Sequence, residues 1–231
     1  MPEYDNKNDQ LAFRNFRNES DFPLLLELNH GSREADNDHE KITFEVIAKV
    51  LSNMDSMTPQ QGVIIAALGD KPVGYSRLGW YSSHPGTLLY YQVSFLLPEY
   101  RMRGFWPQIV ADNERRLRRV ATEHAGVPEC FFQAWASDNQ NDWSAVLNVT
   151  GYHVVRSFNN MLYTLDKLPN KTIPAGLEVR PVKPEHMHSI WKAQKEMNSG
   201  LFENVAEDWL DEKYPNWLAN PENNPRCWQV A

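Results

Sequence analysis

A short segment near the middle of the chain has residues that suit phosphate binding. Residues 98–104 are Pro-Glu-Tyr-Arg-Met-Arg-Gly, between a long apolar run and a stretch with helical periodicity. A helix N-terminus presents N–H groups without an intrahelical partner and about half a unit of positive charge, so it can bind an anion. Gly104 would let a phosphate come close, and Arg101 and Arg103 add charge that suits a pyrophosphate. In isolation, however, this pattern favours a plain strand-to-helix turn.

The charge distribution limits what else the chain can bind. The formal net charge is -7, which argues against a general nucleic-acid binder, because phosphate neutralisation needs a surplus of Lys and Arg. Four more arginines lie close together after the segment at 98–104, and a solvated helix face explains them best. They are Arg115, Arg116, Arg118 and Arg119.

The composition is that of a globular protein, with 42% apolar and 23% charged residues. Cys130 and Cys227 are far apart and belong to no cluster with metal-ligand spacing, so we expect no metal site and a reducing compartment. The longest apolar run, residues 63–68, is too short to span a membrane, and the polar start has no features of a secretory signal. We therefore expect a cytoplasmic protein without a membrane partner.

The elements before the segment at 98–104 follow from apolar periodicity. Alternation over 11–16 predicts a strand, and Ser20 is expected to cap a helix with Pro23 in its first turn. Residues 29–40 are polar and predict a loop, and 42–51 predict a second helix. Strands are expected at 63–68 and 73–80 around a turn at Gly69, followed by a long buried strand at 87–97.

The elements after this segment are predicted in the same way. A helix is expected to run to about residue 124, with Ile109, Val110, Asn113, Leu117 and Val120 on one side. A strand at 130–135, a short helix at 143–149 closed by Gly151, and a last strand at 152–165 follow. Residues 167–176 contain two prolines and are typical of a linker.

This order of elements resembles the GCN5-related N-acetyltransferase (GNAT) family over residues 11–165. The segment from Pro98 to Gly104 is similar to the family's acyl-CoA pyrophosphate loop, Arg/Gln-x-x-Gly-x-Gly/Ala, and Gly151-Tyr152 is similar to its Gly-Phe/Tyr pair. The resemblance implies an α/β (α+β) fold whose mixed, mostly antiparallel sheet has fourth and fifth strands that splay apart. The pantetheine arm of acetyl-CoA would lie between these strands, bonded to backbone at about Phe95, Leu96 and Leu97. The implied acetyl-CoA contacts are Leu96, Leu97, Arg101, Met102, Arg103, Gly104, Phe105 and Trp106.

Three departures from the family's pattern concern the chemistry. Trp106 stands where the second Gly or Ala is expected, and its indole could crowd the pyrophosphate or point into the core. The predicted strand at 87–97 has no carboxylate to act as a base, and Glu99 is best explained as a solvated turn residue. Leu147 stands where a tyrosine commonly protonates the leaving thiolate. The catalytic residues stay unknown, since the other polar candidates have ordinary structural explanations: His84, Tyr90, Tyr91, Asp138, Asn139, Asn141 and Tyr163.

After the linker the pattern of the first elements begins again. Val-Arg-Pro-Val at 179–182 is similar to Phe-Arg-Asn-Phe at 13–16, and Trp-Gln-Val-Ala at 228–231 is similar to Ile-Ile-Ala at 64–66. From the arginine to the last residue of the match is 52 residues in the first copy and 51 in the second. The domains predicted are a polar tail (1–10), a GNAT-like domain (11–166), a linker (167–176) and the incomplete start of a second copy (177–231). Such a fragment would expose Trp191, Trp209 and Trp217 and could mediate homodimerisation.

The function implied by the resemblance is N-acyl transfer. The chain would move an acetyl group from acetyl-CoA to a primary amine of a small molecule. The alternative is a catalytically silent GNAT-like scaffold or interaction module, the degenerate copy of a tandem enzyme. Its cleft would be plugged, for instance by Trp106, or would serve only dimerisation. The acceptor amine is not identified by any residue pattern.

Overall fold

The computed structural model describes residues 10–36, 38, 42–54, 56–84, 86–159, 172–201, 211–219 and 225–230. The chain divides into two compact units, Met1–Val155 and Arg156–Ala231. Each unit is described by itself below. The finer division into tail, domain, linker and second copy stays a prediction.

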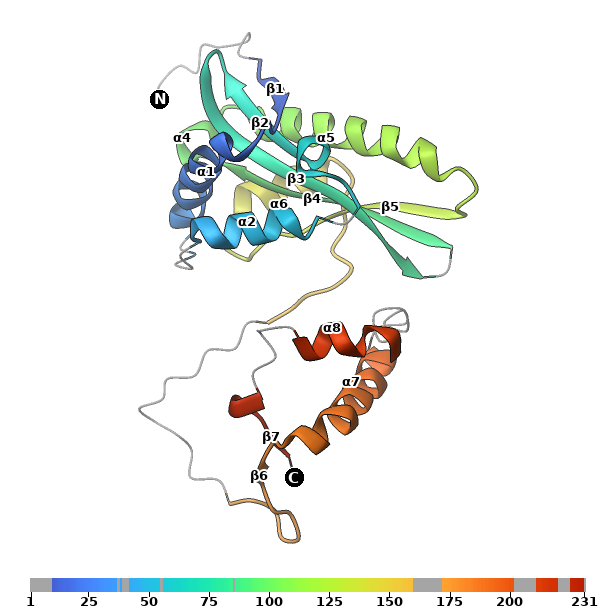
Figure 1. The fold of residues 1–231 in the computed structure, drawn as a ribbon. Coiled ribbons are helices and arrows are strands. Elements are labelled where there is room, and N and C mark those ends of the chain that lie inside the picture. The colour runs from blue at the N-terminus through green and yellow to red at the C-terminus, as the bar shows by residue number, and fades with distance from the viewer. Residues whose placement is uncertain are drawn as a thin grey trace. The chain divides into compact units, whose positions relative to one another are not determined.

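Unit 1 is built on a five-stranded mixed sheet (Figure 1). The first four strands pair antiparallel in chain order, whereas the last two pair parallel, which confirms the predicted mixed and mostly antiparallel sheet. The strands are β1 (Ala12–Asn15), β2 (Val63–Leu68), β3 (Lys71–His84), β4 (Thr87–Leu96) and β5 (Glu129–Ala134).

The pairing of β4 with β5 stops before β4 ends. The parallel register runs from Thr87↔Glu129 to Gln92↔Ala134, while on its other side β4 stays paired with β3 as far as Gly74↔Leu96. Within the described sheet, β4 beyond Gln92 therefore has a neighbouring strand on one side only. We call this opening between the ends of β4 and β5 the fork.

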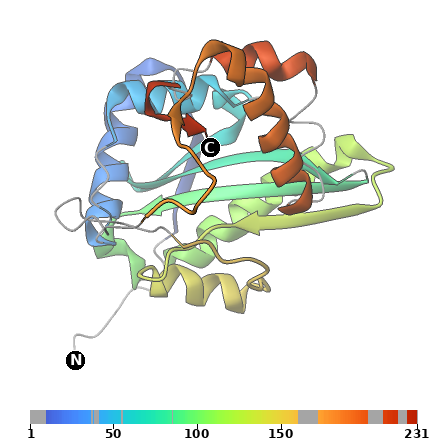
Figure 2. The ribbon, with the colours of Figure 1, turned by 90° about the horizontal axis from the view of Figure 1, so that it is seen from below.

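Helices cover both faces of the sheet (Figure 2). Because successive side chains of a strand point to opposite faces, Phe95 of β4 packs with α1 and α2, whereas Leu96 packs with α5 and α6. The main helices of unit 1 are α1 (Phe22–Ala35), α2 (Phe44–Ser52), α5 (Phe105–Ala121) and α6 (Asn141–Val149). Short helical turns add η1 (Glu19–Asp21), α3 (Pro59–Gly62), α4 (Pro98–Arg101) and η2 (Thr122–His124).

Two predictions around the first helix were wrong. The expected loop at 29–40 is helical as far as Ala35, because α1 buries the polar residues Asn29 and Ser32 on the same face as Leu25 and Leu28, which hides the periodicity. Ser20 is not the cap, since it lies inside η1, where Asn18 accepts a hydrogen bond from the Ser20 amide.

The last predicted strand is also missing from the described chain. Residues 152–159 are in neither a helix nor a strand. The remainder of that prediction, residues 160–165, lies outside the described residues.

Unit 2 contains a two-stranded antiparallel sheet and an aromatic cluster. The cluster joins Trp191 to Tyr214 and Trp217, with ring centroids 5.7 and 5.4 Å apart. Trp191 is 1% exposed, so the expectation that it would be exposed was wrong; Trp209 lies outside the described residues. The elements are β6 (Arg180–Pro181), η4 (Pro184–His186), α7 (Met187–Leu201), η5 (Asp211–Lys213), α8 (Tyr214–Ala219), η6 (Pro225–Cys227) and β7 (Gln229–Val230).

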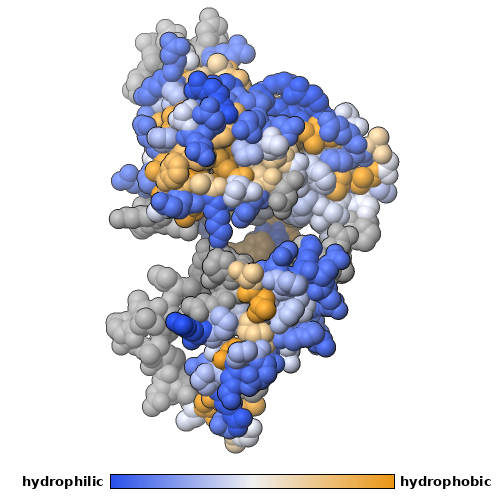
Figure 3. All heavy atoms as spheres, viewed as in Figure 1, coloured by the Kyte–Doolittle hydropathy of each residue, from blue (hydrophilic) through white to orange (hydrophobic). Residues whose placement is uncertain are grey.

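Hydrophobic side chains also reach the surface of unit 1. Figure 3 shows them on the face seen in Figure 1, and on α2 Phe44 and Val46 are 44% and 40% exposed. Within the part of the chain that is described, no helix combines the length and the apolar character needed to cross a membrane.

Candidate functional site

The segment between β4 and α5 forms an open cradle at the start of the helix. Gly104 precedes the first residue of α5 and has the left-handed backbone angle φ of 77°, which favours glycine. A Cβ built on Gly104 meets no atom within 4 Å. The amides of Phe105 and Trp106 lie in the first turn, where N–H groups have no intrahelical partner, whereas Pro107 has no N–H. Unit 1 therefore presents backbone donors beside an unfilled space.

The side chain of Arg101 is directed into the protein. Its guanidinium binds the carboxylate of Asp36 at 2.5 Å and donates to the carbonyl and the hydroxyl of Ser32. Its Nε donates to the carbonyl of Leu96 at 3.0 Å, and the side chain is only 10% exposed. Arg101 thus ties the cradle to the C-terminal end of α1, and its charge is neutralised there.

Asp36 also holds the segment that follows β5. Its backbone carbonyl accepts from the side-chain amide of Asn139, and its carboxylate accepts from Gln140 Nε2 at 2.8 Å. Asp36 itself is 4% exposed. One buried carboxylate therefore joins the end of α1, the cradle and the loop between β5 and α6, which lie on both sides of the fork.

Met102 and Arg103, two further predicted contacts in this segment, differ in their surroundings. Met102 is 77% exposed, whereas the guanidinium of Arg103 lies over the rings of Tyr100 and Phe105, with centroid distances of 5.5 and 5.3 Å. Arg103 is thus the arginine that adds positive charge next to Gly104.

The indole of Trp106 points into the core. Trp106 is 3% exposed, and its Nε1 donates to the carboxylate of Asp142 at 2.8 Å. The ring centroids of Trp106 and Trp143 are 4.6 Å apart. Phe105 is fully buried in the same cluster. The sequence left open whether the indole crowds the cradle or points into the core. In the structure it points into the core and leaves the cradle clear.

Leu96 and Leu97 end the strand at the fork. Leu96 is fully buried, and its carbonyl accepts from Arg101. The Leu97 amide donates to the carbonyl of Val73 at 2.9 Å, which continues the pairing with β3. Backbone contacts from these residues to a pantetheine arm stay a prediction.

The structure shows where three of the positions that the sequence raised for proton transfer lie. Tyr90 is buried with its hydroxyl 2.8 Å from His124 Nδ1, Glu99 is exposed on α4, and Leu147 lies in the core. Tyr163 lies outside the described residues.

Sequence reasoning missed a buried polar network at the fork. Gln92, the last residue of β4 that pairs with β5, donates to the Tyr152 hydroxyl at 2.7 Å. Asn113 of α5 donates to Gln92 Oε1 at 2.8 Å and also bonds Ser76 and Ser94. Burial, followed by the charge of Glu114, raises the pKa of the Tyr152 phenol well above its usual range. One signal was present, since Asn113 is polar but lies on the apolar side of its helix.

No group of three or more His, Cys, Asp or Glu side chains that could hold a metal ion occurs within the described residues. The expected absence of a metal site stays a prediction for the chain as a whole.

Comparisons with known proteins give matches of structure only. No family model matches the sequence, and no curated protein matches it. A GCN5-related N-acetyltransferase from Sphaerobacter thermophilus is similar, with a TM-score of 0.65 and 18% identity over 95% of this chain. This chain spans 66% of the length of that one.

Two further solved structures are less similar. An aminoglycoside acetyltransferase from an uncultured soil metagenomic sample, in complex with sisomicin, has 18% identity over 68% of this chain and 95% of its own, with a TM-score of 0.44. Aminoglycoside N-acetyltransferase AAC(6')-Iy in complex with CoA has 14% identity over 68% of this chain and 96% of its own, with a TM-score of 0.43. The mixed sheet, the fork and the first of these matches together show that the chain has the GCN5-related N-acetyltransferase fold.

Proposed function

We propose that unit 1 is an acyl-CoA-dependent N-acetyltransferase that moves an acetyl group from acetyl-CoA to a primary amine of a small molecule. The observation that carries this proposal is the position of Gly104, a left-handed glycine at the start of α5 that leaves an open cradle next to the fork. The name of the similar Sphaerobacter protein supports the same reaction class.

The cradle suits the pyrophosphate of CoA through its backbone. The amides of Gly104, Phe105 and Trp106 would donate to the phosphate oxygens, and Arg103 adds charge beside them. Arg101 would act indirectly, because its guanidinium is bound to Asp36 and holds the loop in place. The pantetheine arm would enter the fork, where β4 has no neighbour on the β5 side in the described sheet.

The reaction needs an amine nucleophile and a proton for the leaving thiolate. The nitrogen lone pair attacks the thioester carbonyl, a C–N bond forms, the C–S bond breaks, and the thiolate takes up a proton. Tyr152 is the candidate proton donor, because its hydroxyl accepts from Gln92 beside the fork and a phenol carries its proton at neutral pH. β4 carries no carboxylate, so the amine would lose its proton to solvent.

Calorimetric titration with acetyl-CoA and with CoA tests the assignment. We expect both to bind, and we expect CoA thiol to be released when a suitable amine is added. If neither binds at millimolar concentration, the assignment of acetyl-CoA to this unit is wrong. Binding without turnover across a broad panel of amines would instead support the scaffold or interaction module.

We further propose that residues 177–231 form the start of a second copy. The order strand, 3-10 turn, helix and returning strand occurs in both units. The registers also agree, since Arg180 pairs with Val230 as Arg14 pairs with Ile65, and both pairs are antiparallel. Homodimerisation through this unit stays a prediction, which light scattering of the full chain would test, as does the cytoplasmic location.

A further inference from the structure

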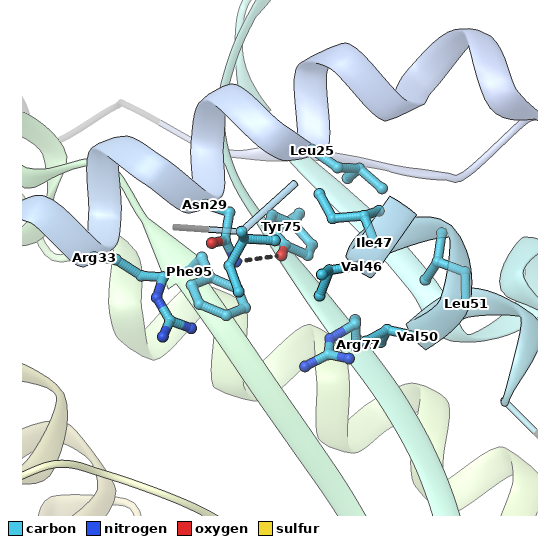
Figure 4. Close-up of a pocket in the computed structure, with 11 residues that line it drawn as sticks. Leu25, Asn29, Arg33, Val46, Ile47, Val50, Leu51, Tyr75, Arg77 and Phe95 are labelled. Carbon is cyan, nitrogen blue, oxygen red and sulfur yellow. Dashed lines mark hydrogen bonds between the residues drawn. The ribbon is translucent and has the colours of Figure 1, made fainter. Parts of the chain in front are cut away.

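A pocket of about 60 Å³ lies between the first two helices and the sheet of unit 1 (Figure 4). It would enclose roughly five water-sized groups, at about 10–15 Å³ for each, so a ligand of the size of leucine would extend from it into solvent. Val46, at its rim, is 40% exposed, so the pocket reaches solvent. The lining residues are Leu25, Asn29, Arg33, Ile42, Val46, Ile47, Val50, Leu51, Tyr75, Arg77 and Phe95.

The periodicity of the helix and the strand brings the polar members of this set together. Asn29 and Arg33 are four residues apart on α1 and therefore share a face. Tyr75 and Arg77 are two residues apart on β3 and point to the face that α1 and α2 cover. Figure 4 shows the guanidinium groups of Arg33 and Arg77 at one end of the pocket and Leu25 at the other.

The pocket is positive and apolar. No aspartate or glutamate belongs to its lining, and eight of its eleven members are aliphatic or aromatic. Arg33 pairs with Asp38 at 2.7 Å, outside the lining. The charges of both arginines reach Tyr75, since each favours ionisation of its phenol, although burial raises the pKa of that phenol on balance.

Arg77 has no counter-charge within the described residues. Its Nε is buried and makes no hydrogen bond there, and its neighbours across the sheet are Val63 and Val93. Arg77 is half-buried, and removing part of a cation from water with no anion nearby is unfavourable, so an anionic ligand would be favoured at this position.

Asn29 offers a second polar contact. Its Nδ2 donates to the Tyr75 hydroxyl at 2.9 Å, whereas its Oδ1 is buried without a partner among the described residues. Asn29 is 4% exposed. A ligand with an N–H group could satisfy this acceptor while an acidic group of the same ligand meets Arg77.

The pocket adjoins the fork. Phe95 lines the pocket and stacks on Tyr75 with ring centroids 4.8 Å apart. Phe95 also lies on β4 beyond Gln92, in the part of the strand that has no β5 neighbour. A molecule in the pocket would therefore lie next to the place where the proposed function puts the thioester.

We propose that this pocket binds the acceptor, and that the acceptor is a small primary amine carrying a carboxylate next to an apolar group, as an apolar amino acid does. This inference rests on the proposed function. The carboxylate would pair with Arg77 and Arg33, the apolar group would contact Leu25 and Ile47, and the amine would face the fork. A polycationic acceptor would be repelled.

Acetyl transfer to a matched pair of amines tests the proposal. L-leucine and L-leucinamide share the amine and the side chain, but only leucine has the carboxylate. We expect a higher kcat/KM for leucine, with no measurable transfer to spermidine. The α-amine of leucinamide is less basic than that of leucine, so a larger share of it is unprotonated and able to react. This difference favours leucinamide and therefore works against the expected result.

Variants of Arg77 separate the pocket from the rest of the site. We expect Arg77→Met to lower kcat/KM for leucine about 10- to 100-fold, which is the usual effect of losing a hydrogen bond to a charged group. The kcat/KM for leucinamide should change little, because leucinamide has no carboxylate. Arg77→Lys should restore part of the difference. Arg119→Met, which removes an exposed charge of the same sign from α5, is the matched control and should change neither value.

These measurements distinguish a failure of the pocket assignment from a failure of the proposed acetyltransferase function. If leucinamide or spermidine is the better acceptor, or if Arg77→Met leaves the ratio of leucine to leucinamide unchanged, the pocket assignment is wrong and the acetyltransferase stands. If CoA does not bind, the acetyltransferase is wrong, and calorimetry with leucine alone still tests the pocket. Binding of leucine that Arg77→Met abolishes would support the pocket, and equal or absent binding in both proteins would overturn it.

Discussion

Arg101 and Asp36 form an ion pair with an N–O distance of 2.5 Å, although 65 positions separate them in the chain. Their side chains are 10% and 5% exposed. The arginine that most suggested phosphate binding is therefore a support of the loop. The groups that remain available to the phosphate that we propose are backbone amides and Arg103.

We expect Asp36→Asn to destabilise unit 1 by about 3–5 kcal/mol, because breaking the buried pair leaves Arg101 only the more distant carboxylate of Asp142, 3.8 Å from its Nε. Urea denaturation followed by circular dichroism measures this. Glu129→Gln, which neutralises an exposed carboxylate of β5 that accepts from the Thr87 hydroxyl, is the control and should cost under about 1 kcal/mol. A loss for Asp36→Asn no larger than that of the control would contradict the role given to this pair.

Gly104→Val should abolish CoA binding while the protein stays folded. A Cβ at this position meets no atom, so the fold bears only the strain of the left-handed backbone, about 1–2 kcal/mol. The new side chain would occupy the space proposed for the pyrophosphate. Gly126→Val is a matched control, since Gly126 has φ of 104° and an equally open Cβ position but lies beyond the other end of α5. Unchanged CoA affinity in Gly104→Val would place the pyrophosphate elsewhere.

Tyr152→Phe should lower kcat at least about tenfold with little change in KM for acetyl-CoA, because general acid catalysis by a positioned side chain contributes typically 10²–10⁴-fold. Steady-state assays of thiol release measure both constants. Loss of the bond from Gln92 will also cost stability, so the melting temperature is measured in parallel. A purely structural role would lower stability and leave kcat of the folded protein unchanged.

The stability of unit 1 should depend on Asp21 in acid. Asp21 accepts from Arg14 and Arg17 and is 2% exposed, and the Arg14 guanidinium holds the pKa of this carboxyl well below its usual range. A depressed folded-state pKa stabilises above the unfolded value of about 3.9, and this contribution is lost as pH falls further. In urea denaturation between pH 7 and pH 2.5, Asp21→Asn should be less stable at pH 7 and lose less stability in acid. Parallel pH profiles for both proteins would contradict this.

The sequence by itself determined the order of most elements and the type of fold. The short apolar run of β2, the turn at Gly69 that leads to β3 and the long apolar β4 are local signals, and so is the helix that follows Gly104. These patterns are local because side-chain periodicity depends only on neighbouring residues. Together with the resemblance to the GNAT family that their order carries, they were enough to predict the cradle and the mixed sheet.

Only the tertiary structure decided what the individual side chains do. Arg101 and Trp106 were candidates for the cradle, yet both turn inward, since Asp36 and Asp142 meet them from distant parts of the chain. The network around Gln92 and the pocket beside Arg77 also combine residues from several elements. Such sites depend on which faces of the helices and strands meet, and a single sequence does not specify this because the residues that meet are far apart in the chain.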